Sequence, residues 1–115
     1  MKLVLIAALG AALAAPAALA RQSATTLNGT VGPGFTITLT KGGKKVTKLK
    51  AGTYVIKIAD KATDHNFHLS GPGVNKSTSV GAKVNVSWTV KLKKGTYKFV
   101  CDPHASFMKG SFTVS

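Results

Sequence analysis

Acidic residues are nearly absent from this sequence, which has three Asp and Glu residues against sixteen Lys and Arg residues and a formal net charge of +13. Arginine is also scarce, because Arg21 is the only one and every other cation is lysine. Arginine is the side chain that best matches bases and phosphates, so this balance argues against a nucleic-acid partner. It favours an acidic protein or an anionic membrane surface. Lysines that only keep a small sheet protein soluble are an equal alternative.

Charge is missing from the start of the chain, where Leu3–Ala20 form one apolar run after a basic residue. A basic start, an apolar stretch and small residues before the polar segment are typical of a secretory signal peptide, which predicts cleavage after Ala20. A membrane anchor is the alternative, because about 18 apolar residues can span a bilayer. The many alanines and Pro16 favour cleavage. We therefore predict a signal peptide at residues 1–20 and a single exported domain at residues 21–115, in the periplasm or another extracytoplasmic compartment.

Only one cysteine, Cys101, is present, so no disulfide can form within the chain. Exported domains usually carry cysteines in pairs, and a lone one indicates an intermolecular bond or a special role. A free thiol in an oxidising compartment needs protection, which metal ligation provides. A buried cysteine that only fills the core is the alternative interpretation.

No helical pattern of any length follows residue 20. Short segments instead alternate apolar and polar residues between turns rich in Gly, Pro and Lys, which predicts β-strands. The clearest strand is residues 83–92, in which Trp88 belongs to the apolar, core-facing set. Phe35, Ile37 and Leu39 are expected to share one face of another strand. Seven or eight such strands in fewer than 100 residues predict an all-β fold, a Greek-key antiparallel β-sandwich.

The segment Phe99–Gly110 places a thiol, an imidazole and a thioether within eight residues, in Cys101, His104 and Met108. Soft thiolate and thioether ligands favour copper, whereas imidazole binds copper or zinc. A structural zinc site would need four strong ligands, and methionine is a poor one. Two imidazoles, one thiolate and a distant axial methionine are typical of a blue-copper electron-transfer site. The segment therefore predicts a copper site that lacks only its second imidazole.

Strand parity favours His65 over His68 as this second imidazole. His65 has the same parity as Phe67 and Leu69, which should face the core, whereas His68 has the opposite parity. Cys101 likewise shares its parity with the apolar residues of its own strand. Because successive side chains of a strand point to opposite faces, His65 and Cys101 are expected to meet at one end of the sandwich interior. His68 is expected to point away and to form hydrogen bonds on the outer face.

These motifs resemble those of the cupredoxins, small blue-copper proteins such as plastocyanin, pseudoazurin and amicyanin. His65 and Asn66 match the family's His-Asn pair at the end of a strand, and the segment Cys101–Met108 matches its Cys-x-Pro-His loop followed by Met. The resemblance covers nearly all of residues 21–115. It implies one copper ion per chain, cycling between Cu(I) and Cu(II) and held by His65, Cys101, His104 and Met108.

The resemblance also implies that Asn66 ties the two ligand segments together and that the turn Gly71–Val74 lies near His104. Two features depart from the family pattern. Three residues separate His104 from Met108, where comparable members mostly have two or four, so the loop length is intermediate. Asp102 follows the cysteine in place of Ser or Thr, and its carboxylate is expected to face solvent.

Together these observations predict an exported mononuclear type 1 copper protein that shuttles single electrons between redox partners and is not an enzyme. A copper oxidase or nitrite reductase would need further coppers, and His68 is the only spare imidazole. The alternative is a copper carrier or buffer that uses the same ligands without a dedicated electron-transfer role. We expect a monomer in which a small apolar patch around His104 contacts a redox partner, with lysines attracting an acidic docking surface on that partner.

Overall fold

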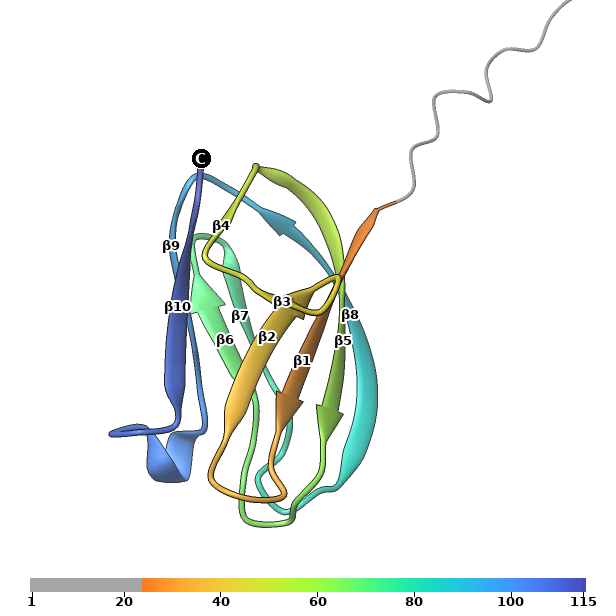
Figure 1. The fold of residues 1–115 in the computed structure, drawn as a ribbon, viewed down its shortest axis with the longest axis vertical. Coiled ribbons are helices and arrows are strands. Elements are labelled where there is room, and N and C mark those ends of the chain that lie inside the picture. Colours follow the sequence, from red (N-terminus) through yellow and green to blue (C-terminus); the bar gives the residue numbers. More distant parts are fainter. Residues whose placement is uncertain (1–23) are drawn as a thin grey trace, which may run out of the picture.

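The computed structural model describes residues 24–115, so the predicted signal peptide lies outside the described residues. Residues 24–115 form two sheets that face each other (Figure 1). The first sheet has the order β3-β2-β1-β5-β8, with β1 (Thr25–Val31), β2 (Ile37–Lys41), β3 (Lys44–Lys45), β5 (Gly52–Asp60) and β8 (Val84–Leu92). The second has the order β4-β10-β9-β6-β7, with β4 (Lys48–Leu49), β6 (His68–Gly71), β7 (Val74–Ser77), β9 (Gly95–Val100) and β10 (Lys109–Val114).

The predicted all-β sandwich is confirmed, with differences in strand number and strand direction. Residues 24–115 form ten strands rather than seven or eight, because β3 and β4 are separate strands of two residues each. The sheets are mixed: β1 runs parallel to β5, and β4 runs parallel to β10. These parallel pairs arise because the chain crosses from the first sheet to β4 in the second sheet and returns for β5.

The core follows the alternation of apolar residues on both sheets. From the first sheet Leu27, Ile56 and Ile58 are at most 2% exposed. From the second sheet Tyr97 and Phe99 are at most 3% exposed, and their rings stack on other core aromatic rings. Trp88 is partly buried and packs against this core, as predicted. Burial of these apolar faces against each other is the main contribution to the stability of such a sandwich.

Phe35 departs from the predicted pattern. Strand β2 begins only at Ile37, so Phe35 belongs to the loop between β1 and β2 and is 63% exposed. The expectation that Phe35 shares a face with Ile37 and Leu39 is therefore wrong. The loop turns at Gly32, whose φ of 75° is a left-handed conformation that glycine adopts without strain.

The two ends of the sandwich differ in content. At one end, called the site end, β1 and β5 finish, β2 and β8 begin, and β9 passes into β10 (Figure 1). At the other, called the far end, β1 and β5 begin, β8 passes into β9, and β10 finishes. In residues 24–115 no helix is long and apolar enough to cross a membrane. The loops of the site end carry all the predicted ligands.

Candidate metal centre

The loop between β9 and β10 is folded back on itself by main-chain hydrogen bonds. Cys101 N–H donates to the Met108 carbonyl at 3.0 Å, and Met108 N–H donates to the His104 carbonyl at 2.8 Å. A single 3-10 turn, Asp102–His104, is closed by His104 N–H donating to the Cys101 carbonyl at 3.0 Å. Pro103 fits the start of this turn because no hydrogen bond is required from its nitrogen. The loop therefore holds Cys101, His104 and Met108 in one compact unit.

His65 reaches the same end from the connection between β5 and β6, and a buried hydrogen-bond network holds this connection in place. The Thr78 hydroxyl donates to Asp60 Oδ2 at 2.8 Å and accepts from Phe67 N–H at 2.9 Å. Thr78 N–H donates in turn to the Phe67 carbonyl at 3.0 Å. Asp60 and Thr78 are both buried. This network fixes the chain two residues beyond His65, and sequence reasoning did not identify it.

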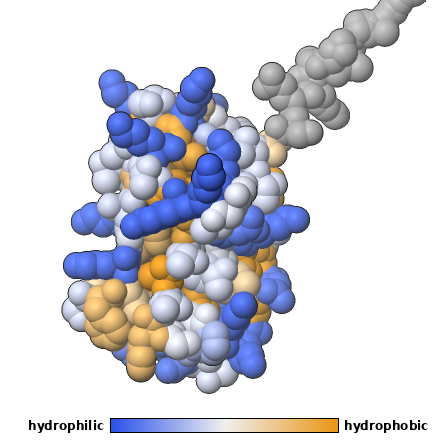
Figure 2. All heavy atoms as spheres, in the orientation of Figure 1, coloured by the Kyte–Doolittle hydropathy of each residue, from blue (hydrophilic) through white to orange (hydrophobic). Residues whose placement is uncertain are grey.

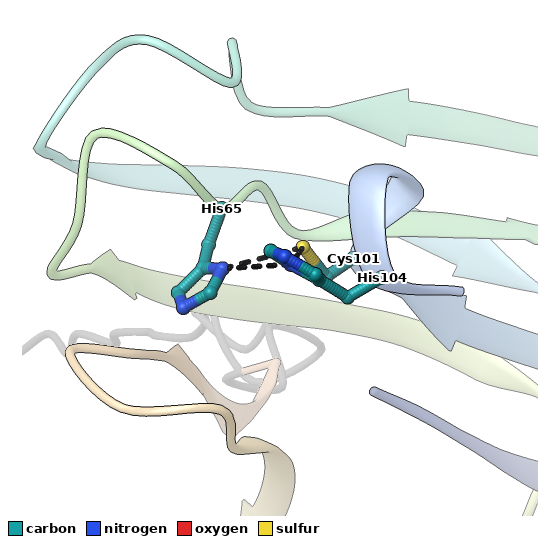
Figure 3. A group of neighbouring side chains, drawn as sticks. All are labelled: His65, Cys101 and His104. Atoms are coloured by element: carbon teal, nitrogen blue, oxygen red, sulfur yellow. Dashed lines mark hydrogen bonds between the residues drawn. The ribbon is translucent and has the colours of Figure 1, made fainter. Parts of the chain in front are cut away.

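Three of the predicted ligands converge on one point (Figure 3). His65 Nδ1 lies 3.2 Å from His104 Nδ1, and Cys101 Sγ lies 3.6 Å from His65 Nδ1 and 3.5 Å from His104 Nδ1. His65 and Cys101 are at most 1% exposed, whereas His104 is partly exposed. The structure therefore brings together the two histidines and the cysteine selected by spacing and parity.

The size and chemistry of this donor triangle fit a transition metal. A point equidistant from the three donor atoms lies about 2.0 Å from each, close to an ordinary metal–imidazole bond length and somewhat short for a metal–thiolate bond. Two imidazoles and one thiolate are the planar donors of a blue-copper site, with a thioether at the axial position. Met108 is 1% exposed at the end of the same loop. Met108 as axial ligand stays a prediction.

A second network joins the two ligand segments outside the triangle. Asn66 Nδ2–H donates to Asp102 Oδ2 at 2.8 Å, and Asp102 N–H donates to Asn66 Oδ1 at 2.7 Å. The predicted role of Asn66 in tying the segments together is therefore confirmed. Asp102 is 48% exposed, as expected for a carboxylate facing solvent, yet both of its oxygens also approach His68 Nδ1 at 2.9 and 3.0 Å.

His68 points away from the triangle, as predicted from its parity. Its Nε2 lies 2.6 Å from Asn75 Oδ1, while its Nδ1 faces Asp102, so both ring nitrogens meet an oxygen acceptor. Hydrogen bonds to Asn75 and then to Asp102 raise the pKa of His68 above 6.5, against a smaller opposing effect of burial. Burial alone would raise the pKa of Asp102, but hydrogen bonds from Asn66 and His68 outweigh it and lower that pKa. The arrangement favours an imidazolium paired with a carboxylate.

His68 is expected to contribute more to the stability of the domain in acid than in alkali. A group whose pKa is raised in the folded state stabilises that state fully below its unfolded pKa, and this stabilisation is lost as pH rises through the folded pKa. The difference in unfolding free energy between the parent protein and His68→Gln should therefore be larger at pH 5 than at pH 9. Denaturant unfolding of both metal-free proteins measures this difference. The contributions of His65 and His104 to the pH dependence are common to both proteins and cancel in the comparison. Equal differences at the two pH values would contradict the expectation.

Phe35 covers the mouth of the site from the loop between β1 and β2. Its ring meets those of His104 and His65 edge-on, with centroids 5.2 and 5.5 Å apart, and lies 5.8 Å from that of Phe107. Gly32 of the same loop packs so close to His65 that an added Cβ would lie 3.1 Å from the ring. The loop between β1 and β2 thus forms one side of the site, and no pattern in the sequence predicted this role of the loop.

The expectation that the turn Gly71–Val74 lies near His104 is wrong. This turn joins β6 to β7 toward the far end, where Tyr97 Oη donates to the Pro72 carbonyl at 2.8 Å and Lys93 lies against Gly73. The earlier Gly-Pro-Gly segment, Gly32–Gly34, leads instead into the loop that carries Phe35 to His104. The two segments have the same sequence but lie at different ends, because one follows β1 at its site end and the other turns between β6 and β7.

The chain matches one protein family and shares its fold with solved copper proteins. The family model of the cupredoxin-like domain matches residues 3–114. Reduced rusticyanin is 23% identical, with a TM-score of 0.58 and 82% of each chain covered. Rusticyanin from Thiobacillus ferrooxidans is 24% identical, with a TM-score of 0.54, covering 81% of this chain and 79% of that one. A Cu(I) amicyanin variant is 17% identical, with a TM-score of 0.50, covering 79% and 83%. No curated protein sequence matches.

The solved structures show that the fold is shared, and the family match extends over nearly the whole sequence. The family match and the cluster of His65, Cys101 and His104 together support one bound copper ion. The predicted resemblance is thereby confirmed at the level of fold, family and cofactor.

Proposed function

Because this chain belongs to the cupredoxin-like family, we propose that it is an exported mononuclear type 1 copper protein that shuttles single electrons between redox partners. The family match and the cluster of two histidines and one cysteine support a copper electron-transfer protein in general. One observation carries the proposal: two imidazole nitrogens and one thiol sulfur lie within 3.6 Å of one another at a largely buried point.

The proposed ligands are His65, Cys101, His104 and Met108. When bound, copper supplies one-electron chemistry between Cu(I) and Cu(II). The protein's contribution is a frame that does not rearrange: the Cys101–Met108 loop is closed by its own peptide hydrogen bonds, and the Asp60–Thr78 network holds the connection that carries His65. Such preorganisation keeps the ligands in place when the charge of the centre changes.

His104 is the proposed contact to a redox partner. It is the exposed member of the donor triangle, and Phe35 and Phe107 beside it are 63% and 57% exposed. Figure 2 shows an apolar patch at the lower left of the molecule, at the site end. An apolar patch of this kind suits brief contacts with a partner that has to leave again.

An acidic docking surface on that partner stays a prediction, but the charges at the site end do not favour it. The site end carries Lys61, Lys83 and Lys109, and all three carboxylate side chains of the sequence, Asp60, Asp64 and Asp102, lie at the same end. Little net charge is therefore left around His104. We propose that apolar contact rather than attraction by lysines dominates docking at this surface.

Export through a signal peptide at residues 1–20 and a periplasmic or other extracytoplasmic location complete the proposal. A protein of this kind is a carrier rather than an enzyme, in keeping with the family. The alternative function is that of a copper carrier or buffer that uses the same ligands. Redox cycling of the copper-loaded protein distinguishes this alternative from electron transfer.

The copper-loaded protein is expected to show an intense visible thiolate-to-copper band that disappears on mild reduction and returns on reoxidation. Absorption spectra recorded through repeated cycles, with the copper content measured after each cycle, test this. Rapid mixing with a small soluble redox protein then tests whether electrons pass between proteins. A band that never forms would overturn the type 1 assignment. Release of copper on reduction, or failure to exchange electrons, would favour the carrier or buffer.

A further inference from the structure

The positive charge of the domain is concentrated at the far end, away from the metal centre. Eight of its lysines lie there, and all eight are exposed: Lys41, Lys44, Lys45, Lys48, Lys50, Lys91, Lys93 and Lys94. Lys57, Lys76 and Lys98 lie between the two ends. Because every Asp of the sequence lies at the site end, no acidic side chain balances the far-end lysines. The domain is therefore strongly polarised.

Two turns and one short strand bring these lysines together. The segment Lys41–Lys50 contains five of them, and β4 within it pairs with the end of β10. Lys93 and Lys94 form the turn between β8 and β9, next to the paired ends of β5 and β8. A hollow of about 680 Å³ opens beside the first of these segments and is lined by Lys41, Lys48 and Lys50. Ser115 also lines it.

The far end lacks the features of a protein interface. Interface cores are depleted of lysine and rely on aromatic or other apolar anchors. Among residues 24–115 the exposed large apolar side chains are Phe35, Val80 and Phe107, and all three lie in loops of the site end. Figure 2 likewise shows hydrophilic side chains projecting from the upper end of the molecule. A surface of lysines without an anchor suits a diffuse anionic partner such as a layer of lipid headgroups, which lysines attract without fixed geometry.

The course of the chain agrees with a lipid surface. Strand β1 begins at the far end, where Thr25 pairs with Tyr54, and the hollow is lined by both residues. The apolar run Leu3–Ala20 therefore precedes a strand that enters the domain on the same end as the lysines. When the exported chain emerges from a membrane, the far end is therefore the part of the domain that meets that membrane first.

We propose that the far-end lysines form a docking surface for an anionic lipid membrane and hold the domain with its metal centre turned away from the bilayer. Strand β5 links the two ends, and the steps between its nine residues, at about 3.3 Å each, place the site end about 26 Å from the far end. The exposed edge of His104 and its apolar surroundings would then face the solution while the domain rests on the membrane. This proposal rests on the export and the metal centre of the proposed function but does not require electron transfer, so a failure of electron exchange would leave it standing.

Vesicle binding tests the proposal with a charge-matched pair of variants. One variant carries Lys44→Gln, Lys45→Gln and Lys48→Gln at the far end. The other carries Lys61→Gln, Lys83→Gln and Lys109→Gln at the site end, so both lose three charges. Exported protein, with its N-terminus read by mass spectrometry, is sedimented with phosphatidylglycerol-containing or purely phosphatidylcholine vesicles. The ratio of the two partition coefficients is the readout, because any apolar anchoring is common to both vesicles.

The parent protein is expected to prefer the anionic vesicles, with a preference that falls as salt is raised. The far-end variant should lose this preference by on the order of tenfold or more at low salt, and the site-end variant by less than about threefold. Equal losses in both variants, or no preference in the parent protein, would overturn the proposal. Tighter binding to polyglutamate than to vesicles at equal anionic charge would instead assign the surface to an acidic protein. The visible spectrum of each variant reports the metal centre separately.

Discussion

Replacing Cys101 with serine is expected to abolish the intense visible band of the copper-loaded protein completely. The band of a blue-copper centre requires a thiolate bonded to copper, and Cys101 is the only thiol in the chain. Its Sγ completes the triangle with His65 and His104 at 3.6 and 3.5 Å, so no other residue can take its place. Copper affinity should fall as well, because a serine hydroxyl is a much weaker ligand for this metal.

The fold should survive this substitution. Serine is slightly smaller than cysteine, and its hydroxyl can hydrogen-bond to the two Nδ1 atoms that now face the buried thiol. Far-UV circular dichroism checks the fold, and absorption with metal analysis checks the site. Ser106→Ala, an exposed change in the same loop, is the matched control and should leave the band unchanged. A Cys101→Ser protein that kept the band would remove the thiolate from the proposed site.

Replacing His65 with alanine is expected to remove the second imidazole and to lower copper affinity by more than the roughly 10–100-fold that the loss of a ligand's hydrogen-bond partner costs. His68→Ala is the matched control, since it removes an imidazole three residues along that faces Asp102 and Asn75 instead of the triangle. The His68→Ala protein should keep its visible band and most of its affinity. Competition titration with a copper chelator measures both.

His65 is buried, so the His65→Ala protein is also compared with the parent protein in the metal-free state. A loss of copper binding in a protein that still unfolds cooperatively reports on ligation and not on a failure to fold. The reverse outcome, in which His68→Ala loses copper and His65→Ala keeps it, would contradict the ligand set and the parity argument behind it.

The alternation of side chains along the strands predicted the ligands well, because burial of the apolar residues fixes which side chains face inward. A slip of one residue would move Phe67 and Leu69 out of the core, so His65 has to face inward, and the same reasoning applies to Cys101 and Phe99. The spacing of Cys101 and His104 is local and depends on a single turn. Such features follow from short-range rules and can be predicted from the sequence.

The remaining features depend on which loops meet in space. Phe35 was expected in a strand, but the strand starts two residues later and frees its ring to cover His104. Asp60 ends β5 and Thr78 follows β7, eighteen residues later, and only the folded arrangement of these segments at the site end brings them together. The separation of lysines from aspartates likewise needs the strand topology, because the sequence alone does not say that Lys44 and Lys93 lie at the same end.

Unfolding would separate His65 from the Cys101–Met108 loop but would leave Cys101 and His104 three residues apart. An unfolded chain therefore still offers copper a thiol, an imidazole and a thioether on one short segment. A ligand that binds the unfolded state as well as the folded state stabilises the fold by less than its affinity for the folded state alone would give. Copper should accordingly raise the unfolding temperature only modestly for its affinity, and a chain that unfolds briefly can keep its metal until it refolds.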